Sequence, residues 1–142
     1  MKIVRYVGSD PARFNDLIDN FLGYTYRVSH GAAWAVNYCA EYHRELVRPY
    51  FRRLIEQLER EDAHVAVRRN VARLLQFVDI PPRYRGRVFD ACYNLVDDPA
   101  QPIAVKVFAL TVAAKIANDK PELLGELRLM AEKHAPHLSI GF

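Results

Sequence analysis

The chain has 142 residues, of which 51% are hydrophobic and 26% are charged, and this composition indicates a folded globular domain rather than a disordered segment. The formal charge is only +3, which excludes the profile of a dedicated nucleic-acid coat protein. No apolar run approaches the roughly 18 residues of a membrane helix, and the first residues lack the apolar core of a signal peptide. We therefore expect a cytoplasmic protein.

Apolar residues recur at helical spacing along the chain, and strand signals are weak. Ser9-Asp10-Pro11 has the composition of a helix start, because a capping residue precedes a proline. Four helices are predicted in the first half, over about residues 11–22, 29–42, 48–60 and 64–78. Asp79-Ile80-Pro81-Pro82 ends the fourth, since proline cannot continue a helix.

Three further helices are predicted over about residues 83–97, 102–117 and 121–134, followed by a loop at 135–142. The segment 102–117 is apolar nearly all round, so we expect it to be covered on more than one side. Asp97-Asp98 ends a helix before Pro99, and we interpret it as a capping arrangement rather than an acid/base pair.

The chain matches itself at an offset of 38 residues. Ala66-Val67-Arg68 aligns with Ala104-Val105-Lys106, and Phe51 aligns with Phe89. A repeat of this length that contains two helices indicates an α-solenoid. We predict one all-α domain over residues 1–142, with helix pairs at about 9–47, 48–80 and 82–119 and a capping helix at 121–135.

The repeated segments resemble a HEAT repeat. One unit runs from Pro49-Tyr50-Phe51 through a short acidic turn to Val67-Arg68-Arg69, and the next carries Ala104-Val105-Lys106. The resemblance covers about residues 48–119 well, whereas Trp34-Ala35-Val36-Asn37 replaces the Val-Arg pattern in the first unit. It implies a short right-handed superhelix, as in small free-standing bacterial HEAT-like chains. It also implies that partners bind a concave face lined by the helices of Trp34, Arg69 and Lys106.

Two stripes are candidates for a partner surface. Trp34, Tyr38 and Tyr42 recur every four residues, and exposed aromatic side chains at this spacing would suit a binding hot spot. The alternative is that these rings pack on neighbouring helices. A second stripe contains Arg69, Arg73 and Gln76, which suit a carboxylate-rich peptide or a phosphate backbone.

The alternative for the arginine stripe is a structural role, in which its side chains form ion pairs within the repeat to Glu56, Glu59 or Asp62. Arg68 and Lys106 occupy equivalent repeat positions, and we expect them to pair with acids at the turns between helices.

The basic excess lies in the middle third of the chain. Between Arg44 and Arg87 there are eleven arginines and six acids, a local balance of +5. Arg83, Arg85 and Arg87 lie at a helix start, where cations oppose the helix dipole. This basic patch suits an acidic or phosphate-bearing partner, and the alternative is a solvated helix face.

Residues that would carry enzymatic chemistry are scattered. The five histidines show no metal spacing, the six glycines form no phosphate-binding loop, and no serine lies in a nucleophile elbow. Cys39 and Cys92 lie among apolar residues, so we expect buried free thiols. We expect no metal and no cofactor.

The leading hypothesis is a non-enzymatic interaction or scaffold module that binds a protein segment along the concave face. One alternative is nucleic-acid binding. Another follows from the resemblance, because some DNA glycosylases that excise alkylated bases are built from HEAT-like repeats. A homodimer through a terminal helix is a third alternative, because the segment 102–117 is very apolar and the open end of the solenoid is short.

Overall fold

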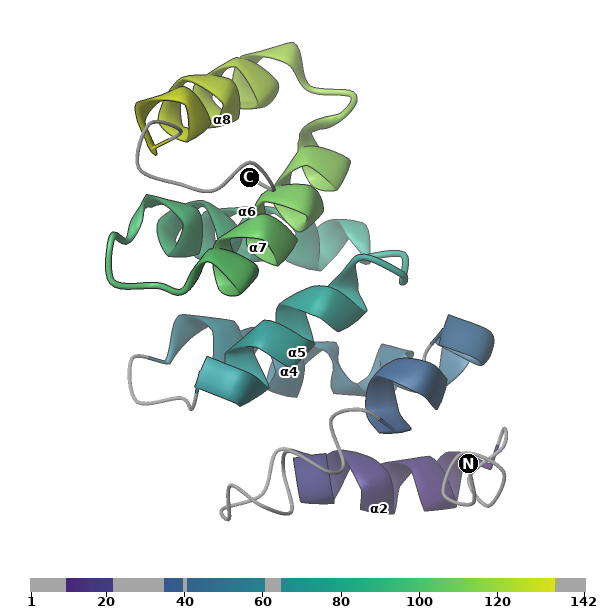
Figure 1. The fold of residues 1–142 in the computed structure, drawn as a ribbon. Coiled ribbons are helices and arrows are strands. Elements are labelled where there is room, and N and C mark those ends of the chain that lie inside the picture. The colour runs from purple at the N-terminus through teal and green to yellow at the C-terminus, as the bar shows by residue number, and fades with distance from the viewer. Residues whose placement is uncertain (1–9, 22–34, 40, 61–64, 135–142) are drawn as a thin grey trace. The chain divides into compact units, whose positions relative to one another are not determined.

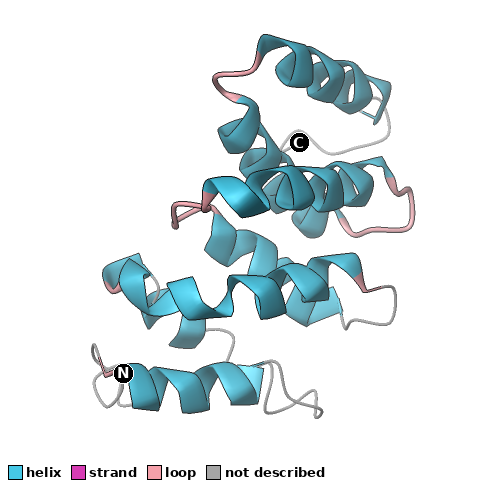
Figure 2. Cartoon of the chain, turned by 180° about the vertical axis from the view of Figure 1, so that it is seen from behind, coloured by secondary structure: helices cyan, strands magenta, loops and turns pink. Residues whose placement is uncertain are grey.

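The computed structural model describes residues 10–21, 35–39, 41–60 and 65–134, and these residues contain helices and connecting turns but no strand (Figures 1 and 2). The described part of the chain confirms the predicted all-α, HEAT-like class. Two compact units can be distinguished, Met1–Asp79 and Ile80–Phe142, and each is described by itself. Their boundary lies beside the one predicted between the second and third helix pairs, at residues 80–82. The single-domain assignment stays a prediction.

The first unit contains α2 (Pro11–Phe21), a helical segment at residues 35–39 and 41–42 that we call the tyrosine helix, the 3₁₀ helix η1 (Arg44–Tyr50), α4 (Phe51–Glu59) and α5 (Val65–Leu75). The predicted start of α2 is confirmed. The Asp10 Oδ1 atom accepts hydrogen bonds from the backbone N–H groups of Ala12 at 2.9 Å and Arg13 at 3.3 Å. Asp10 therefore satisfies two of the donors that a helix start leaves without a helical partner.

The third predicted helix begins later than expected. Residues 44–50 form a 3₁₀ helix with Pro49 inside it, and the α-helix begins at Phe51 rather than at residue 48. Proline has no N–H group, so the α-helical hydrogen-bond pattern cannot extend back through Pro49 to Glu45. Leu46 N–H already bonds the His43 carbonyl at 3.1 Å, which is the tighter 3₁₀ pattern.

Polar contacts hold α2 against the start of α4. The Tyr50 hydroxyl donates to Asn15 Oδ1 at 2.9 Å, and Arg53 Nη1 pairs with Asp19 Oδ1 at 2.9 Å. The Phe14 and Tyr50 rings meet edge to face, with centroids 5.7 Å apart. Tyr50 is half-buried rather than fully in the core, because its hydroxyl reaches a polar partner at the surface.

Helix α5 ends three residues before the predicted Val78. Gln76 and Phe77 donate backbone hydrogen bonds to Arg73 and Leu74, at 3.2 and 3.1 Å, and these contacts to the third preceding residue close the last turn. Val78 is still buried, so the apolar pattern identified a core residue that lies beyond the helix.

The second unit contains α6 (Pro82–Asp97), α7 (Ile103–Ala117) and α8 (Pro121–His134), within one residue of the predicted bounds. Helix α7 packs against both α6 and α8, as its apolar circumference indicated. In the turn between α6 and α7, Asp98 Oδ1 accepts a hydrogen bond from the Ala100 N–H at 2.9 Å. Asp98 thus has the structural role that the sequence indicated.

Both ends of α6 are tied to neighbouring elements. At its start, Arg85 Nε donates to the Ile80 carbonyl at 2.8 Å. At its end, the Asp97 carboxylate lies 3.0 Å from His134 Nε2 and 3.5 Å from Lys133 Nζ, which belong to the last turn of α8. Asp97 therefore joins the ends of two helices.

The 38-residue repeat is visible in the burial of equivalent residues. Phe51 and Phe89 are both buried, while Val65 and Ile103 are exposed to nearly the same extent, at 40% and 41%. Arg68 and Lys106 are also equivalent, and each is at least nine-tenths buried. Several matching sequence positions therefore have matching environments in the two units, although Ala66 is buried and the equivalent Ala104 is exposed.

Candidate partner surface

The exposed aromatic residues of the first unit lie on the tyrosine helix. Tyr38 is 38% exposed and Tyr42 is 64% exposed, and their ring centroids are 5.1 Å apart at an interplanar angle of 43°. Trp34, the third member of the predicted stripe, lies outside the described residues. The alternative in which these rings are buried against neighbouring helices does not hold for Tyr42.

Tyr38 influences the ionisation of Tyr42. A hydrogen bond with Tyr38 and the nearby charges of Tyr38 and Glu41 raise the pKa of Tyr42. The Tyr42 phenol therefore stays neutral at physiological pH. The pair presents apolar ring faces together with hydroxyl groups, a combination that is common at protein interfaces.

Asn37 connects the tyrosine helix to α5. Its side chain is 4% exposed, and its Nδ2 atom donates to the Asn70 carbonyl at 3.3 Å. Asn70 Nδ2 in turn donates to the Ala66 carbonyl at 2.8 Å. The hydrogen bond shows that the tyrosine helix and α5 are neighbours. Asn37 precedes Tyr38 and Asn70 follows Arg69, so Tyr38 and Arg69 lie near this contact on the two helices.

Sequence reasoning missed the role of Asn37. Its signal is a polar residue among the small apolar side chains Ala35, Val36 and Cys39, all of which are buried. Burying an amide is costly unless it is hydrogen-bonded, so an amide on an apolar face indicates a specific contact.

The arginine stripe lies on α5, where Arg69, Arg73 and Gln76 are all half-buried. Gln76 Nε2 donates to the Arg73 carbonyl at 3.3 Å. Within the described residues neither Arg69 nor Arg73 forms an ion pair, and Glu56 pairs instead with Arg52 at 3.5 Å. The expected pairing with Glu56 is therefore not made, and Asp62 lies outside the described residues.

The buried cation Arg68 has a structural contact. Its Nη2 atom donates to the Arg60 carbonyl at the end of α4, and the acids of the following turn, with which we expected it to pair, lie outside the described residues. This bond ties the two helices of one pair together. The equivalent Lys106 makes no ion pair in the part of the chain that the structure describes.

The predicted basic patch on α6 divides between two helix faces. All three arginines are exposed, and the Arg83 guanidinium lies 4.9 Å from the centroid of the Tyr84 ring. Successive helical residues are about 100° apart, so Arg83 and Arg87 share a face that Arg85 does not. Whether any of them contacts a partner stays a prediction.

Both cysteines are buried free thiols, and burial raises the pKa of Cys39 and raises that of Cys92 to about 12. Neither is a thiolate at neutral pH, which a nucleophile or a metal ligand would require. Among the described residues, no group of three or more histidine, cysteine or acidic side chains is placed to hold a metal ion. No described helix has both the length and the apolarity needed to cross a bilayer.

Comparison with known proteins identifies the family to which the chain belongs. Neither the curated proteins nor the solved structures gave a match to the chain. The model of the HEAT repeat domain matches residues 1–141, nearly the whole sequence. HEAT repeat domains generally mediate protein interactions and are generally non-enzymatic. The 38-residue repeat of helix pairs, the matching burial of its equivalent positions and this match together place the chain in the HEAT repeat family.

Proposed function

We propose that the protein is a non-enzymatic interaction module that binds an acidic protein segment. The binding surface, here called the tyrosine–arginine surface, consists of Tyr38, Tyr42, Arg69, Arg73 and Gln76. The observation that carries the proposal is the exposed tyrosine pair, which lies on a helix joined through Asn37 to the helix of two arginines. Those arginines form no ion pair with a described residue.

The chemistry of this surface favours a peptide that contains carboxylates. Half-buried guanidinium groups are weakly hydrated and bind carboxylates with two parallel hydrogen bonds. The two tyrosines contribute apolar area at a small entropic cost, since each has only two side-chain torsions. A reducing compartment such as the cytoplasm suits the two buried free thiols.

Affinity capture with a tagged full-length chain tests the proposal. Tyr42→Ala and the double variant Arg69→Ala/Arg73→Ala should each lose the captured partner. Matched controls are Leu129→Ala, because Leu129 is also highly exposed, at 70%, and Arg52→Ala, because Arg52 is an exposed arginine outside the surface. Helix content measured by circular dichroism should be unchanged in all forms. Capture of the same proteins by every folded variant would remove the surface assignment.

The nucleic-acid alternative is separated by an oligonucleotide filter-binding assay. Phosphate contacts release counterions, so such binding weakens steeply between about 0.05 and 0.2 M salt. Tight, salt-sensitive binding that is lost in Arg69→Ala/Arg73→Ala would replace the proposed protein partner with a nucleic acid. We expect no such binding.

A further inference from the structure

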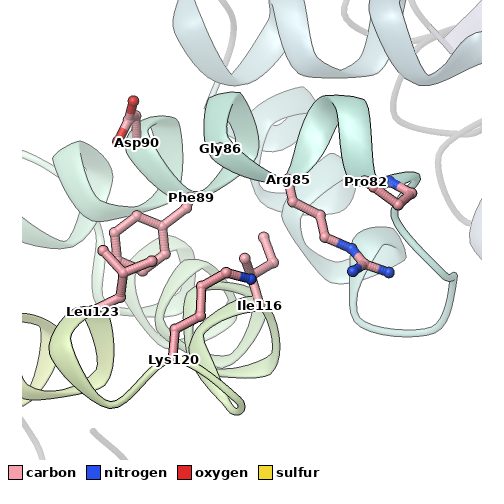
Figure 3. Close-up of a pocket in the computed structure, with 8 residues that line it drawn as sticks. All are labelled: Pro82, Arg85, Gly86, Phe89, Asp90, Ile116, Lys120 and Leu123. Atoms are coloured by element: carbon pink, nitrogen blue, oxygen red, sulfur yellow. The ribbon is translucent and has the colours of Figure 1, made fainter.

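The second unit contains a cavity of about 330 Å³ at the start of α6, the end of α7 and the start of α8 (Figure 3). Phe89, Ile116 and Leu123 supply its apolar lining, and Arg85, Asp90 and Lys120 supply charged groups. This volume lies at the lower end of the range of small-molecule sites, about 300–1,000 Å³, and the mixture of apolar wall and few charged groups is typical of them.

Gly86 forms part of the cavity wall. It lies within α6 and is exposed, and a Cβ atom added to it would meet no atom within 4 Å. Close packing therefore does not require glycine here. A larger side chain at this position would extend into open space beside Phe89, which lies one helical turn further along the same face.

The charged groups favour an anion. In Figure 3 the Lys120 side chain extends over the apolar residues toward Phe89 and Ile116, while the Asp90 carboxylate is turned away from them. Arg85 keeps one bond to the Ile80 carbonyl and forms no ion pair with a described residue. The Lys120 ammonium lies 3.6 Å from Asp119, but the Asp119 side chain is 77% exposed, so this pair is weak and a ligand can replace it.

The backbone adds to the positive potential. Pro82 is the first residue of α6 and Lys120 precedes the first residue of α8, so the N-terminal ends of two helices border the cavity. These ends carry a partial positive charge and donors without helical partners. Two cationic side chains and two helix starts therefore line the cavity, with the Arg85 guanidinium on the side of Pro82 (Figure 3).

We propose that this cavity binds a small carboxylic acid that has an apolar chain or ring. The apolar body enters between Phe89, Ile116 and Leu123, and the carboxylate accepts a hydrogen bond from Lys120, with Arg85 as a second cation. This site is independent of the tyrosine–arginine surface, which belongs to the other unit. A negative binding result at one site therefore leaves the proposal for the other site unaffected.

Amide chemical shifts of the ¹⁵N-labelled full chain test the proposal during titration with octanoate below its micelle concentration. The amides of Gly86, Phe89, Lys120 and Leu123 should shift together and saturate. Octylamine and 1-octanol carry the same chain without the carboxylate, and acetate carries the carboxylate without the chain. Each should bind at least about tenfold more weakly, as the loss of one charge-assisted hydrogen bond or of the apolar contact predicts.

Two variants and one matched control sharpen the test. Gly86→Leu should fill the cavity and abolish the octanoate shifts. Gly125→Leu changes a glycine in α8 that also has no neighbour within 4 Å but does not line the cavity, so it should bind like the original chain. Lys120→Glu should weaken octanoate binding at least about tenfold and leave 1-octanol binding unchanged.

Three results would overturn the proposal. One is the absence of saturable shifts at these amides, and another is equal binding of octanoate, octylamine and 1-octanol. The third is full octanoate binding by Gly86→Leu. Lys120→Glu keeps the test decisive even where Gly86→Leu fails to fold, because Lys120 is exposed and its replacement leaves the core intact.

Discussion

At the scale of single residues, Asp97 shows how a charge at the wrong end of a helix is compensated. An acid in the last turn of α6 opposes the helix dipole. His134 and Lys133 lie within 3.5 Å of its carboxylate, and the hydrogen bond with His134 followed by the Lys133 charge lowers the pKa of Asp97. The same two basic residues lie in the last turn of α8, where positive charge is favourable.

Replacement of Asp97 should therefore have a pH-dependent cost. The folded-state pKa lies below the unfolded one, so the stabilisation is present above about pH 4 and is lost as the pH falls through the folded-state value. Asp97→Asn should lower the free energy of unfolding by about 1 kcal/mol or less near neutrality, since the carboxylate is partly exposed.

Urea unfolding of both forms at several pH values measures this difference. The gap between them should close at acidic pH. Asp119→Asn, at an exposed acid that touches only Lys120 among the described ion pairs, serves as the control and should show almost no gap. A difference that stays constant down to about pH 2.5 would show that the Asp97 charge does not contribute.

A second residue-scale prediction concerns Gly86. Glycine in a helix interior is less favourable than alanine by roughly 0.5–1 kcal/mol, because it loses more backbone freedom on folding. A Cβ atom at Gly86 would meet no neighbour within 4 Å, so Gly86→Ala should raise the free energy of unfolding by about that amount. Thermal unfolding of the full chain checks it, with Gly125→Ala as a second helical glycine expected to behave alike. A lower midpoint would mean that the glycine has a structural role that its open surroundings do not show.

At the scale of the element, helix starts are set by local chemistry and are therefore readable from sequence. Asp10 caps α2 through two backbone hydrogen bonds, and proline lies at the first or second position of α6. The start of α4 and the end of α5 each differ from the prediction by about three residues. Helix α5 closes at Leu75 through a tightened turn, although apolar spacing continues to Val78.

Loss of the α2 cap should have a measurable cost. Asp10→Ala removes the acceptor of the Ala12 and Arg13 N–H groups and should lower stability by about 1 kcal/mol, whereas Asp10→Asn retains an acceptor and should lose less. Urea unfolding measures both variants, and amide exchange of Ala12 and Arg13 locates the effect. Equal losses in the two variants would indicate that the carboxylate charge, rather than the hydrogen bonds, supports the helix start.

At the scale of the whole molecule, the chain divides into two compact units, and each contains one copy of the 38-residue helix pair. Several equivalent residues are buried or exposed alike in both, including Arg68 and Lys106, which are both buried. A repeat architecture stabilises each unit mainly through contacts with its neighbours, which favours one cooperative transition when the units are coupled. The single domain predicted over residues 1–142 requires such coupling and stays a prediction.

The two cysteines test the coupling, because one lies in each unit and both are inaccessible. We expect neither thiol to react with an aromatic disulfide reagent in the native chain at neutral pH, since burial hides the sulfur and raises the thiol pKa. In urea, Cys39 in a Cys92→Ala chain and Cys92 in a Cys39→Ala chain should become reactive at the same midpoint. Two separate midpoints would show that the units unfold independently.

The sequence by itself determined the helical class, the repeat length and nearly every helix start of the described chain, because periodicity, capping residues and proline act over only a few residues. It also identified the exposed tyrosines and the arginine stripe as candidates. Only the tertiary structure decided that Asn37 joins their helices and that Arg68 contacts a backbone carbonyl. It alone revealed that Gly86 and Lys120 share a cavity wall. These contacts join residues that are distant in the chain, and no local pattern encodes which distant groups meet.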